Sequence, residues 1–176
     1  MKKILIVVDM QNDFIDGSLG TAEAQAIVGR VAQKIESFDG DVLFTQDTHF
    51  EDYLSTAEGK KLPVEHCIKG TRGFALNARV QAACDKKGAV GVEKRTFGAK
   101  TLPELLSARY PDGVESIELI GLCTDICVIS NALLLKAFFP ETPIAVDASC
   151  CAGVTPASHD TALSAMRACQ IDVEGA

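Results

Sequence analysis

A regular alternation of short apolar runs with segments of helical periodicity constrains the fold most strongly. Apolar runs of strand length occupy residues 3–9, 41–47, 89–93, 116–121, 143–148 and 171–174. Apolar residues recur at helical spacing between them, in residues 22–38, 75–84, 101–108, 124–139 and 156–169. Strands that alternate with helices predict a mainly parallel sheet covered on both faces. We therefore expect one α/β domain over residues 1–176, with three α/β/α layers and a Rossmann-like architecture.

Local signals refine the expected element boundaries. Thr101, with Glu104 three residues later, has the pattern of a helix N-cap, and Pro156 fits the first turn of the last helix. Residues 48–71 show no clear periodicity, so we expect a long irregular segment there. The apolar run at residues 132–139 predicts either core packing or an interface in a homodimer or higher homo-oligomer.

Charge and cysteine content narrow the possible partners. The net charge is −7, and an acidic surface repels nucleic-acid phosphates and anionic lipids, so we expect neither nucleic acid nor membrane as partner. The apolar start is interrupted by Asp9 and Asp13, with no small-residue cleavage site after it, which favours a cytoplasmic protein. Seven cysteines without a regular framework predict reduced, mostly buried thiols.

Several chemically reactive side chains follow strand ends. Asp9 ends the first predicted strand, Asp47 ends the second, Lys94 follows the third, and residues 121–127 follow the fourth. In parallel sheets the ligand site lies beyond the carboxyl ends of the strands. We therefore expect these four segments to meet at one edge of the sheet.

The turn at residues 121–128 is the most informative stretch. A buried strand passes through Gly121 directly into a helix, and the amide N–H groups of such a helix start can hold an oxyanion. Cys127 lies in the first helical turn, where the helix dipole lowers the pKa of a thiol, so it is a candidate nucleophile. Two alternatives remain open. Cys123 and Cys127 fit core packing equally well, or they form a metal or redox pair, a role also conceivable for Cys150 and Cys151.

A cysteine nucleophile needs a base, and the three histidines are poorly placed for it. His159 follows Pro156 and suits a cap or the surface, and His49 and His66 flank the irregular segment. Asp9 is the natural substitute, because a carboxylate enclosed by apolar walls has a raised pKa and can shuttle a proton. Lys94 would then hold the thiolate. The alternatives are a helix cap or a hydrogen-bond anchor for Asp9 and a surface position for Lys94.

Asp47 and His49 project from the same side of an extended segment. His66 follows after a loop that contains Glu58. One or two carboxylates with two imidazoles suit Zn²⁺, Mn²⁺ or Fe²⁺. Solvated polar loop residues are the alternative interpretation.

Six segments together resemble the isochorismatase-like cysteine hydrolases, a family that includes nicotinamidases. Asp9 to Phe14 resembles the N-terminal signature, and Gly121 to Val128, with its Thr-Asp-x-Cys core, resembles the nucleophile turn. The metal loop, the second metal histidine, the catalytic lysine and the closing stretch are matched by residues 45–49, 63–71, 94–98 and 147–159. The matches follow the family order and span nearly the whole chain.

This resemblance implies a six-stranded parallel sheet and a set of roles. Asp9 would be the general acid/base, Lys94 its charged partner and Cys127 the nucleophile. A non-proline cis peptide would join Leu122 to Cys123 and aim the Cys123 N–H, with that of Cys127, at the developing oxyanion. Asp47, His49 and His66 match metal-ligand positions. Tyr53 stands where many members have a further histidine, and Glu58 fits the variant with a glutamate.

The resemblance further implies hydrolysis of a small amide through a thioester acyl-enzyme. Nicotinamide is the expected substrate, and no organic cofactor is expected. The alternatives are isochorismatase-type or other small amide or ureido hydrolysis, or a non-catalytic small-molecule-binding α/β module. Four apolar residues are candidates for the walls of a pocket around a flat ring, with core packing as their alternative: Phe14, Leu19, Leu62 and Phe97.

Overall fold

A computed structural model describes all 176 residues of the chain. Its strands are β1 (Lys2–Val8), β2 (Asp41–Asp47), β3 (Val90–Lys94), β4 (Val114–Leu122), β5 (Ile144–Ala152) and β6 (Asp172–Glu174). Its α-helices are α1 (Asn12–Ile15), α2 (Ala22–Ser37), α3 (Ala57–Lys61), α4 (Ala78–Lys87), α5 (Leu102–Arg109), α6 (Ile129–Phe138) and α7 (Pro156–Ala168). A 3₁₀ turn (Tyr53–Ser55) precedes α3, and a π-helical turn (Thr124–Val128) precedes α6.

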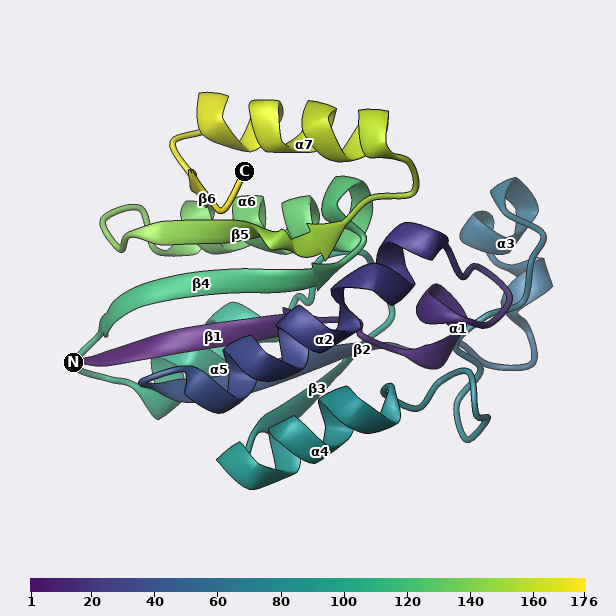
Figure 1. Cartoon of the computed structure of the whole chain (residues 1–176), viewed down its shortest axis with the longest axis horizontal. Coiled ribbons are helices and arrows are strands. Elements are labelled where there is room, and N and C mark those ends of the chain that lie inside the picture. Colours follow the sequence, from purple (N-terminus) through teal and green to yellow (C-terminus); the bar gives the residue numbers. More distant parts are fainter.

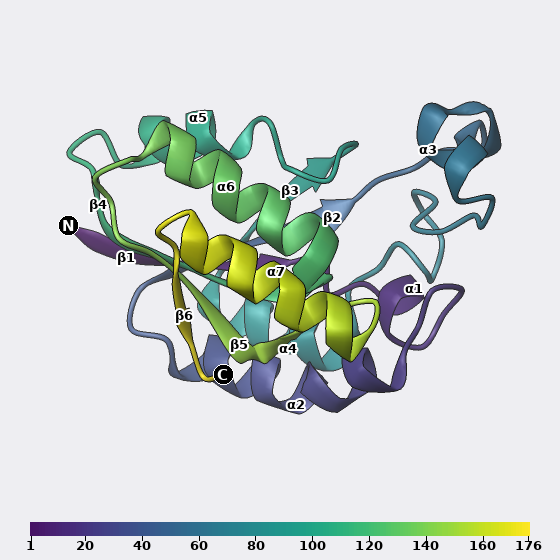
Figure 2. The same ribbon diagram turned by 90° about the horizontal axis from the view of Figure 1, so that it is seen from above.

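The six strands form one parallel sheet in the order β3-β2-β1-β4-β5-β6 (Figure 1). Helices α2 and α4 cover one face, and α5, α6 and α7 cover the other (Figure 2). The three-layer α/β/α architecture expected from the sequence is therefore confirmed.

Each face of the sheet has its own hydrophobic core because side chains alternate along the central strand. In β1, Ile4, Ile6 and Val8 pack toward α5, α6 and α7. The intervening Leu5 and Val7 pack toward α2 and α4. A strand that is buried on both faces has a continuous apolar sequence, which explains the uninterrupted run at the start of the chain.

The chain reverses its direction of winding between β1 and β4, and this is the switch point of the sheet. Val8 and Gly121 lie side by side there as register partners. Gly121 has a φ of +116°, and a Cβ at this position would lie 2.2 Å from the carbonyl oxygen of Val8. Only glycine fits there, so the close approach of the two strand ends depends on it.

Some local predictions need correction. Thr101 is not a side-chain N-cap: its backbone is already helical, and its side chain makes no capping bond. Helix α4 begins at Ala78 rather than at residue 75, because Asn77 accepts a hydrogen bond from the Arg79 N–H and caps it. Strand β5 continues to Ala152 and includes Cys150 and Cys151, both buried.

The segment expected to be irregular contains short helical elements. Thr56 starts α3 by accepting a hydrogen bond from the Gly59 N–H, a local cap that the polar composition concealed. In the apolar run 132–139, Ala132 and Leu135 join the core, whereas Leu133 and Phe138 are exposed. The expected homo-oligomer therefore stays a prediction.

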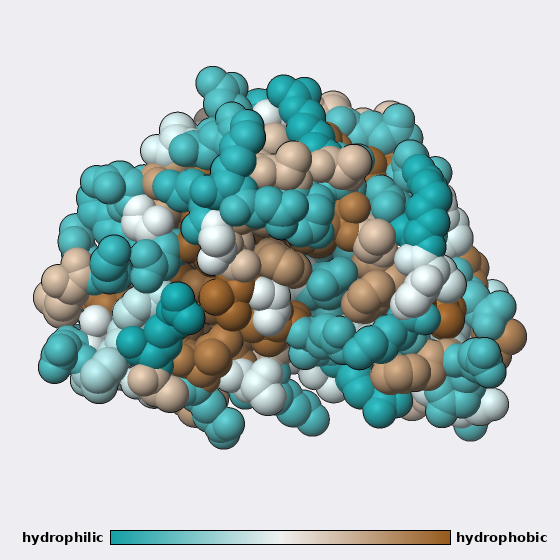
Figure 3. Space-filling view, turned by 90° about the horizontal axis from the view of Figure 1, so that it is seen from below, coloured by the Kyte–Doolittle hydropathy of each residue, from teal (hydrophilic) through white to brown (hydrophobic).

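The surface on the side of edge strand β3 is mostly hydrophilic, with hydrophobic residues gathered near its middle (Figure 3). None of the helices combines the length and the apolar character needed to cross a membrane. All seven cysteines are free thiols in the structure.

Candidate active site

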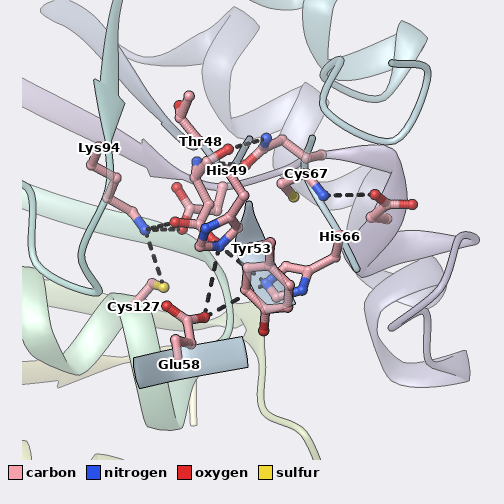
Figure 4. A network of polar contacts seen from close by, with 12 residues as sticks. Thr48, His49, Tyr53, Glu58, His66, Cys67, Lys94 and Cys127 are labelled. Carbon is pink, nitrogen blue, oxygen red and sulfur yellow. Dashed lines mark hydrogen bonds and ion pairs between the residues drawn. The ribbon is translucent and has the colours of Figure 1, made fainter. Parts of the chain in front are cut away.

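Three buried side chains from separate strand ends meet at the switch point. Asp9 directly follows β1, Lys94 is the last residue of β3, and Cys127 lies in the π-helical turn after β4. The Lys94 Nζ atom lies 2.7 Å from Asp9 Oδ2 and 3.3 Å from Cys127 Sγ (Figure 4). The sheet thus brings an acid, an ammonium group and a thiol together from positions far apart in the sequence.

The two oxygens of the buried Asp9 carboxylate have different partners. Asp9 has a φ of +46°, which is rare for a residue with a side chain. Its Oδ1 atom accepts a hydrogen bond of 2.6 Å from the Thr45 hydroxyl. Its Oδ2 atom is buried and pairs electrostatically with Lys94, but it accepts no well-aligned hydrogen bond. Oδ2 is therefore available as a proton acceptor.

Burial dominates the protonation behaviour of this group. Burial raises the pKa of Asp9 above its ordinary value, although the Lys94 charge opposes the shift. Burial, followed by the negative charge of Asp9, raises the pKa of the Cys127 thiol well above its usual range. This direction is opposite to the lowering expected from the helix dipole, whereas the expected roles of Asp9 as base and of Lys94 as partner of the thiolate stay predictions. The resting group is a neutral thiol that needs a base.

The nucleophile turn has the backbone features that the family resemblance implies. The Leu122–Cys123 peptide bond is cis. The Cys123 carbonyl accepts hydrogen bonds from the amides of both Ile126 and Val128, whereas the Cys123 N–H itself has no acceptor. Such π-helical turns are frequent at functional sites. The turn leaves a free amide donor beside the thiol.

A cluster of four potential metal ligands adjoins the three reacting groups. The Nε2 atom of His49 lies 3.0 Å from Asp47 Oδ2 and 3.7 Å from Glu58 Oε1. The Nε2 atom of His66 lies 3.6 Å from Asp47 Oδ2 and 3.7 Å from Glu58 Oε1. Ligands of a tetrahedral ion with bonds of about 2.1 Å lie roughly 3.4 Å apart. The spacing of this donor set fits a small divalent ion.

Two loop contacts bring the histidines together. The His49 N–H donates to the Cys67 carbonyl at 3.0 Å, which lays the His66 segment alongside the end of β2. The Cys67 N–H donates to Asp13 Oδ2 at 2.7 Å, and Cys67 has a φ of +48°. Asp13, a residue of the N-terminal signature, therefore fixes the second histidine. His66 Nδ1 contacts the Val64 carbonyl, so Nε2 faces the cluster.

Tyr53 occupies the position of the additional histidine found in many relatives, but it is not placed as a ligand. Its ring is fully buried and packs edge-on against the rings of His49 and His66, with centroid distances of 4.6 and 5.0 Å. Its hydroxyl donates to the Leu62 carbonyl at 2.9 Å. Burial raises the pKa of Tyr53 to about 12, so the hydroxyl stays neutral. Glu58 supplies the fourth donor instead.

Cys127 and the cluster of four potential metal ligands line one cavity of about 750 Å³. Cys123 and Cys127 lie in its wall with Asp47, His49, Glu58 and His66. The four apolar residues expected to form pocket walls also line it: Phe14, Leu19, Leu62 and Phe97. A cavity of this size that combines apolar walls with convergent polar side chains is typical of small-molecule sites.

Several residues that support the site escaped the sequence reasoning. Buried Asn131 on α6 donates to the carbonyls of Cys127 and Phe97 and accepts from the Ala99 N–H. A polar residue on an otherwise apolar helix was the available signal, because buried amides are almost always hydrogen-bonded. His159 is neither a cap nor a simple surface residue, since its Nδ1 lies 2.7 Å from the Thr124 hydroxyl in the nucleophile turn.

Gln11 explains another part of the N-terminal signature. Its side chain accepts from the Asp47 N–H at 2.7 Å and donates to the Asp47 carbonyl at 2.8 Å. It also donates to the Phe74 carbonyl at 2.9 Å. This amide fixes the backbone at the end of β2, from which Asp47 reaches both the lysine and the histidines.

The fold and site define a class of protein: a three-layer α/β protein with an aspartate, a lysine and a cysteine beside a histidine–carboxylate cluster. The family model of the isochorismatase domain matches residues 3–175. The chain belongs to the isochorismatase family.

Relatives and solved structures agree with this assignment. The isochorismatase family protein PncA of Bacillus subtilis (strain 168) is 31% identical over 175 residues and covers 93% of each chain. A pyrazinamidase/nicotinamidase structure from Streptococcus mutans UA159 has a TM-score of 0.84 and 29% identity, over 97% of this chain and 99% of the other. A Pyrococcus horikoshii pyrazinamidase structure in complex with zinc has a TM-score of 0.79 and 25% identity, over 98% of each chain.

Proposed function

We propose that this protein is a cysteine hydrolase that cleaves a small amide through a thioester, most closely in the manner of a nicotinamidase. The observation that carries the proposal is the contact of Lys94 Nζ with both Asp9 and Cys127 in a buried site that opens into a cavity. Acyl transfer needs a nucleophile, a base within reach of its proton and donors for the oxyanion. Each of these has a candidate here.

Proton transfer from Cys127 to Asp9 starts the reaction. The thiol is neutral at rest, and Asp9 Oδ2 lies 2.7 Å from Lys94 Nζ, whose other contact is the Cys127 sulfur. Lys94 keeps its charge, because the acids around it raise its pKa despite burial. Its ammonium group stabilises the thiolate once the proton has moved to Asp9.

The thiolate then attacks the amide carbonyl, and the C–N bond breaks after a tetrahedral intermediate. The free Cys123 N–H, together with the Cys127 N–H, is the proposed donor set for the oxyanion. Asp9 returns its proton to the departing nitrogen, which leaves as ammonia. A water molecule, deprotonated by Asp9, hydrolyses the thioester and restores the thiol.

Asp47, His49, Glu58 and His66 would hold a divalent ion, with Zn²⁺, Mn²⁺ and Fe²⁺ as candidates. A bound ion would supply a Lewis-acid site for an electron-pair donor of the substrate, such as a pyridine nitrogen. The zinc complex of the Pyrococcus horikoshii pyrazinamidase supports this assignment. In this chain Tyr53 and Gln11 orient the donors that such an ion requires.

Nicotinamide is the proposed substrate for two reasons. The Streptococcus mutans structure of the same fold is that of a pyrazinamidase/nicotinamidase. In addition, Phe14 and Phe97 line the cavity beside the ligand cluster, where a flat ring with a nitrogen donor would pack.

The test is ammonia release from nicotinamide and a panel of small amides. The parent chain is compared with Cys127→Ala and with Cys84→Ala, a buried cysteine beneath the opposite face of the sheet. We expect release by the parent and by Cys84→Ala, and none above background by a folded Cys127→Ala. Ammonia release by Cys127→Ala at the parent rate would reject the proposal.

A further inference from the structure

The cavity beyond the reacting groups carries positive charge in an otherwise acidic chain. The net charge of the protein is −7, yet Lys61 and Arg95 both line the cavity. The acids in its wall, Asp47 and Glu58, face the two histidines. Neither Lys61 nor Arg95 forms an ion pair or a side-chain hydrogen bond, in contrast to exposed cations such as Lys69. Two unpaired cations therefore border the space that a substrate must enter.

Arg95 is held in place by an aromatic ring rather than by an acid. Its guanidinium carbon lies 4.7 Å from the centroid of the Phe50 ring. Stacking of this kind orients the planar group and leaves the N–H donors at its edge free. Arg95 directly follows Lys94 in the sequence, so its backbone is joined to that of Lys94 at the end of β3. A free guanidinium edge is the preferred partner of carboxylate and phosphate groups.

Lys61 lines the same cavity as Arg95 but comes from a different segment of the chain. It ends α3, the short helix that also carries Glu58. A lysine in the last turn can stabilise a helix dipole, but the neighbouring Lys60 provides the same charge without lining the cavity. Lys61 and Lys60 therefore form a natural matched pair in which only Lys61 contributes to the site.

The volume of the cavity exceeds what a single small ring requires. Cavities of several hundred Å³ generally enclose drug-sized ligands, and this one measures about 750 Å³. Its lining extends from Cys127 past Phe97 to Thr21 and Val154. A substrate that also reached Arg95 or Lys61 would fill more of this space than nicotinamide.

We propose that the preferred substrate is an amide that bears an anionic group, a carboxylate or a phosphate, held by Arg95 and Lys61 away from the scissile bond. This proposal rests on the proposed amide hydrolysis and names its substrate class. Both cations are exposed where they line the cavity, so their attraction for an anion is long-range and sensitive to salt. Binding then orients the amide toward Cys127.

The test compares amides in pairs that differ only in charge. Suitable pairs are 5-carbamoylpyridine-3-carboxylate against nicotinamide, succinamate against succinamide, and a phosphonate analogue against its neutral ester. We expect at least one anionic member to exceed its neutral mate about ten-fold in kcat/KM, mainly through a lower KM. The carboxylate and phosphonate arms distinguish the two anions. An advantage of every neutral amide over its anionic mate would overturn the proposal.

Charge-removing variants locate the effect. Arg95→Gln and Lys61→Gln should lower kcat/KM for the favoured anionic amide by about ten-fold more than for its neutral mate. Lys60→Gln, the matched control, should leave the ratio of the two unchanged. The preference should also shrink as salt rises from low to physiological concentration. If Arg95→Gln and Lys61→Gln lower kcat/KM equally for both amides, the two cations do not bind the anionic group.

Binding to an inactive variant separates this proposal from the proposed hydrolysis. Calorimetry with Cys127→Ala and 5-carbamoylpyridine-3-carboxylate should detect binding that Arg95→Gln weakens about ten-fold. If this binding occurs while the parent releases no ammonia from any amide, the anion site stands and the hydrolytic function fails. If the parent hydrolyses nicotinamide and the Cys127→Ala variant binds no anionic amide, the hydrolysis stands and the anion site fails.

Discussion

The proposed reacting groups and the histidine–carboxylate cluster lie beside one cavity, but the chain positions them in different ways. Asp9, Lys94 and Cys127 stand at or just beyond strand ends, where the parallel sheet sets their positions. His49, Glu58 and His66 stand on the segment that follows β2, where the His49 N–H donates to the Cys67 carbonyl and the Cys67 N–H donates to Asp13. A rigid sheet therefore fixes the chemistry, while a supported loop determines what the site binds.

Asp47 joins the two regions. Its Oδ1 atom lies 3.2 Å from Lys94 Nζ, and its Oδ2 atom faces both histidines. Although burial acts in the opposite direction, hydrogen bonds from the histidines and the charge of Lys94 hold the pKa of Asp47 well below its usual value. Asp47 thus favours its ionised form, and Asp9 is the carboxylate that we propose as the proton carrier. Two carboxylates beside one lysine have opposite roles because their other neighbours differ.

The largest effect should follow from removal of the base. Asp9→Asn keeps the shape of the side chain but cannot accept the thiol proton, so we expect kcat to fall by about 10³-fold. Steady-state ammonia release measures the loss, and circular dichroism controls for folding. Asp16→Asn, an exposed acid of the same N-terminal region, is the matched control. A folded Asp9→Asn variant with more than a tenth of the parent kcat would contradict the assignment.

The second-largest effect should follow from removal of one donor of the histidine–carboxylate cluster. His66→Ala removes one of four donors, and we expect the affinity for Zn²⁺ to fall by at least about 100-fold, as measured by competition with a chromogenic chelator. Tyr53→Phe keeps the buried ring between the histidines and should retain most of the affinity. If Tyr53→Phe loses as much affinity as His66→Ala, the hydroxyl rather than Glu58 belongs to the donor set.

A smaller effect should follow from loss of the amide that ties the nucleophile helix to the lysine loop. Asn131→Ala leaves the buried Ala99 N–H and two carbonyls without partners, so we expect a loss of about 2 kcal/mol in the free energy of unfolding. Urea denaturation measures it. The Asn77→Ala variant, which removes the half-buried N-cap of α4, should lose about half as much. Equal stability of Asn131→Ala and the parent would show that water replaces these bonds.

The smallest effect concerns the hydrogen bond that the Thr45 hydroxyl donates to Asp9 Oδ1. The Thr45 hydroxyl lowers the pKa of Asp9 by hydrogen bonding to its charged form, so Thr45→Val should raise that pKa further. Since the reaction needs ionised Asp9, activity is lost as pH falls through this pKa. The acid limb of the kcat/KM profile should therefore move to higher pH in Thr45→Val and stay in place in Thr45→Ser. An unmoved limb in Thr45→Val would assign the titration to another group.

The difference between residues at strand ends and residues on the connecting segments also explains what could be predicted from the sequence. Strand-end residues such as Asp9 and Lys94 were predictable, because a parallel sheet gathers carboxyl ends whatever the loops do. The contacts of Thr45 and Asn131 were not predictable, because they depend on side-chain directions across strands and helices. The cations of the cavity were equally hidden, since Lys61 and Arg95 look like ordinary surface residues until the loop is folded over the site. The lowering of the Cys127 pKa expected from the helix dipole had the wrong direction, because burial and the charge of Asp9 raise this pKa.

The most direct test of the account is mass spectrometry of the protein quenched in acid during turnover of nicotinamide. A thioester at Cys127 predicts a transient mass increase equal to a nicotinoyl group, mapped by digestion to the peptide that contains this cysteine. The adduct should be absent from Cys127→Ala and should form far more slowly in Asp9→Asn. An adduct on any other cysteine, or rapid turnover by Cys127→Ala, would contradict the central claim.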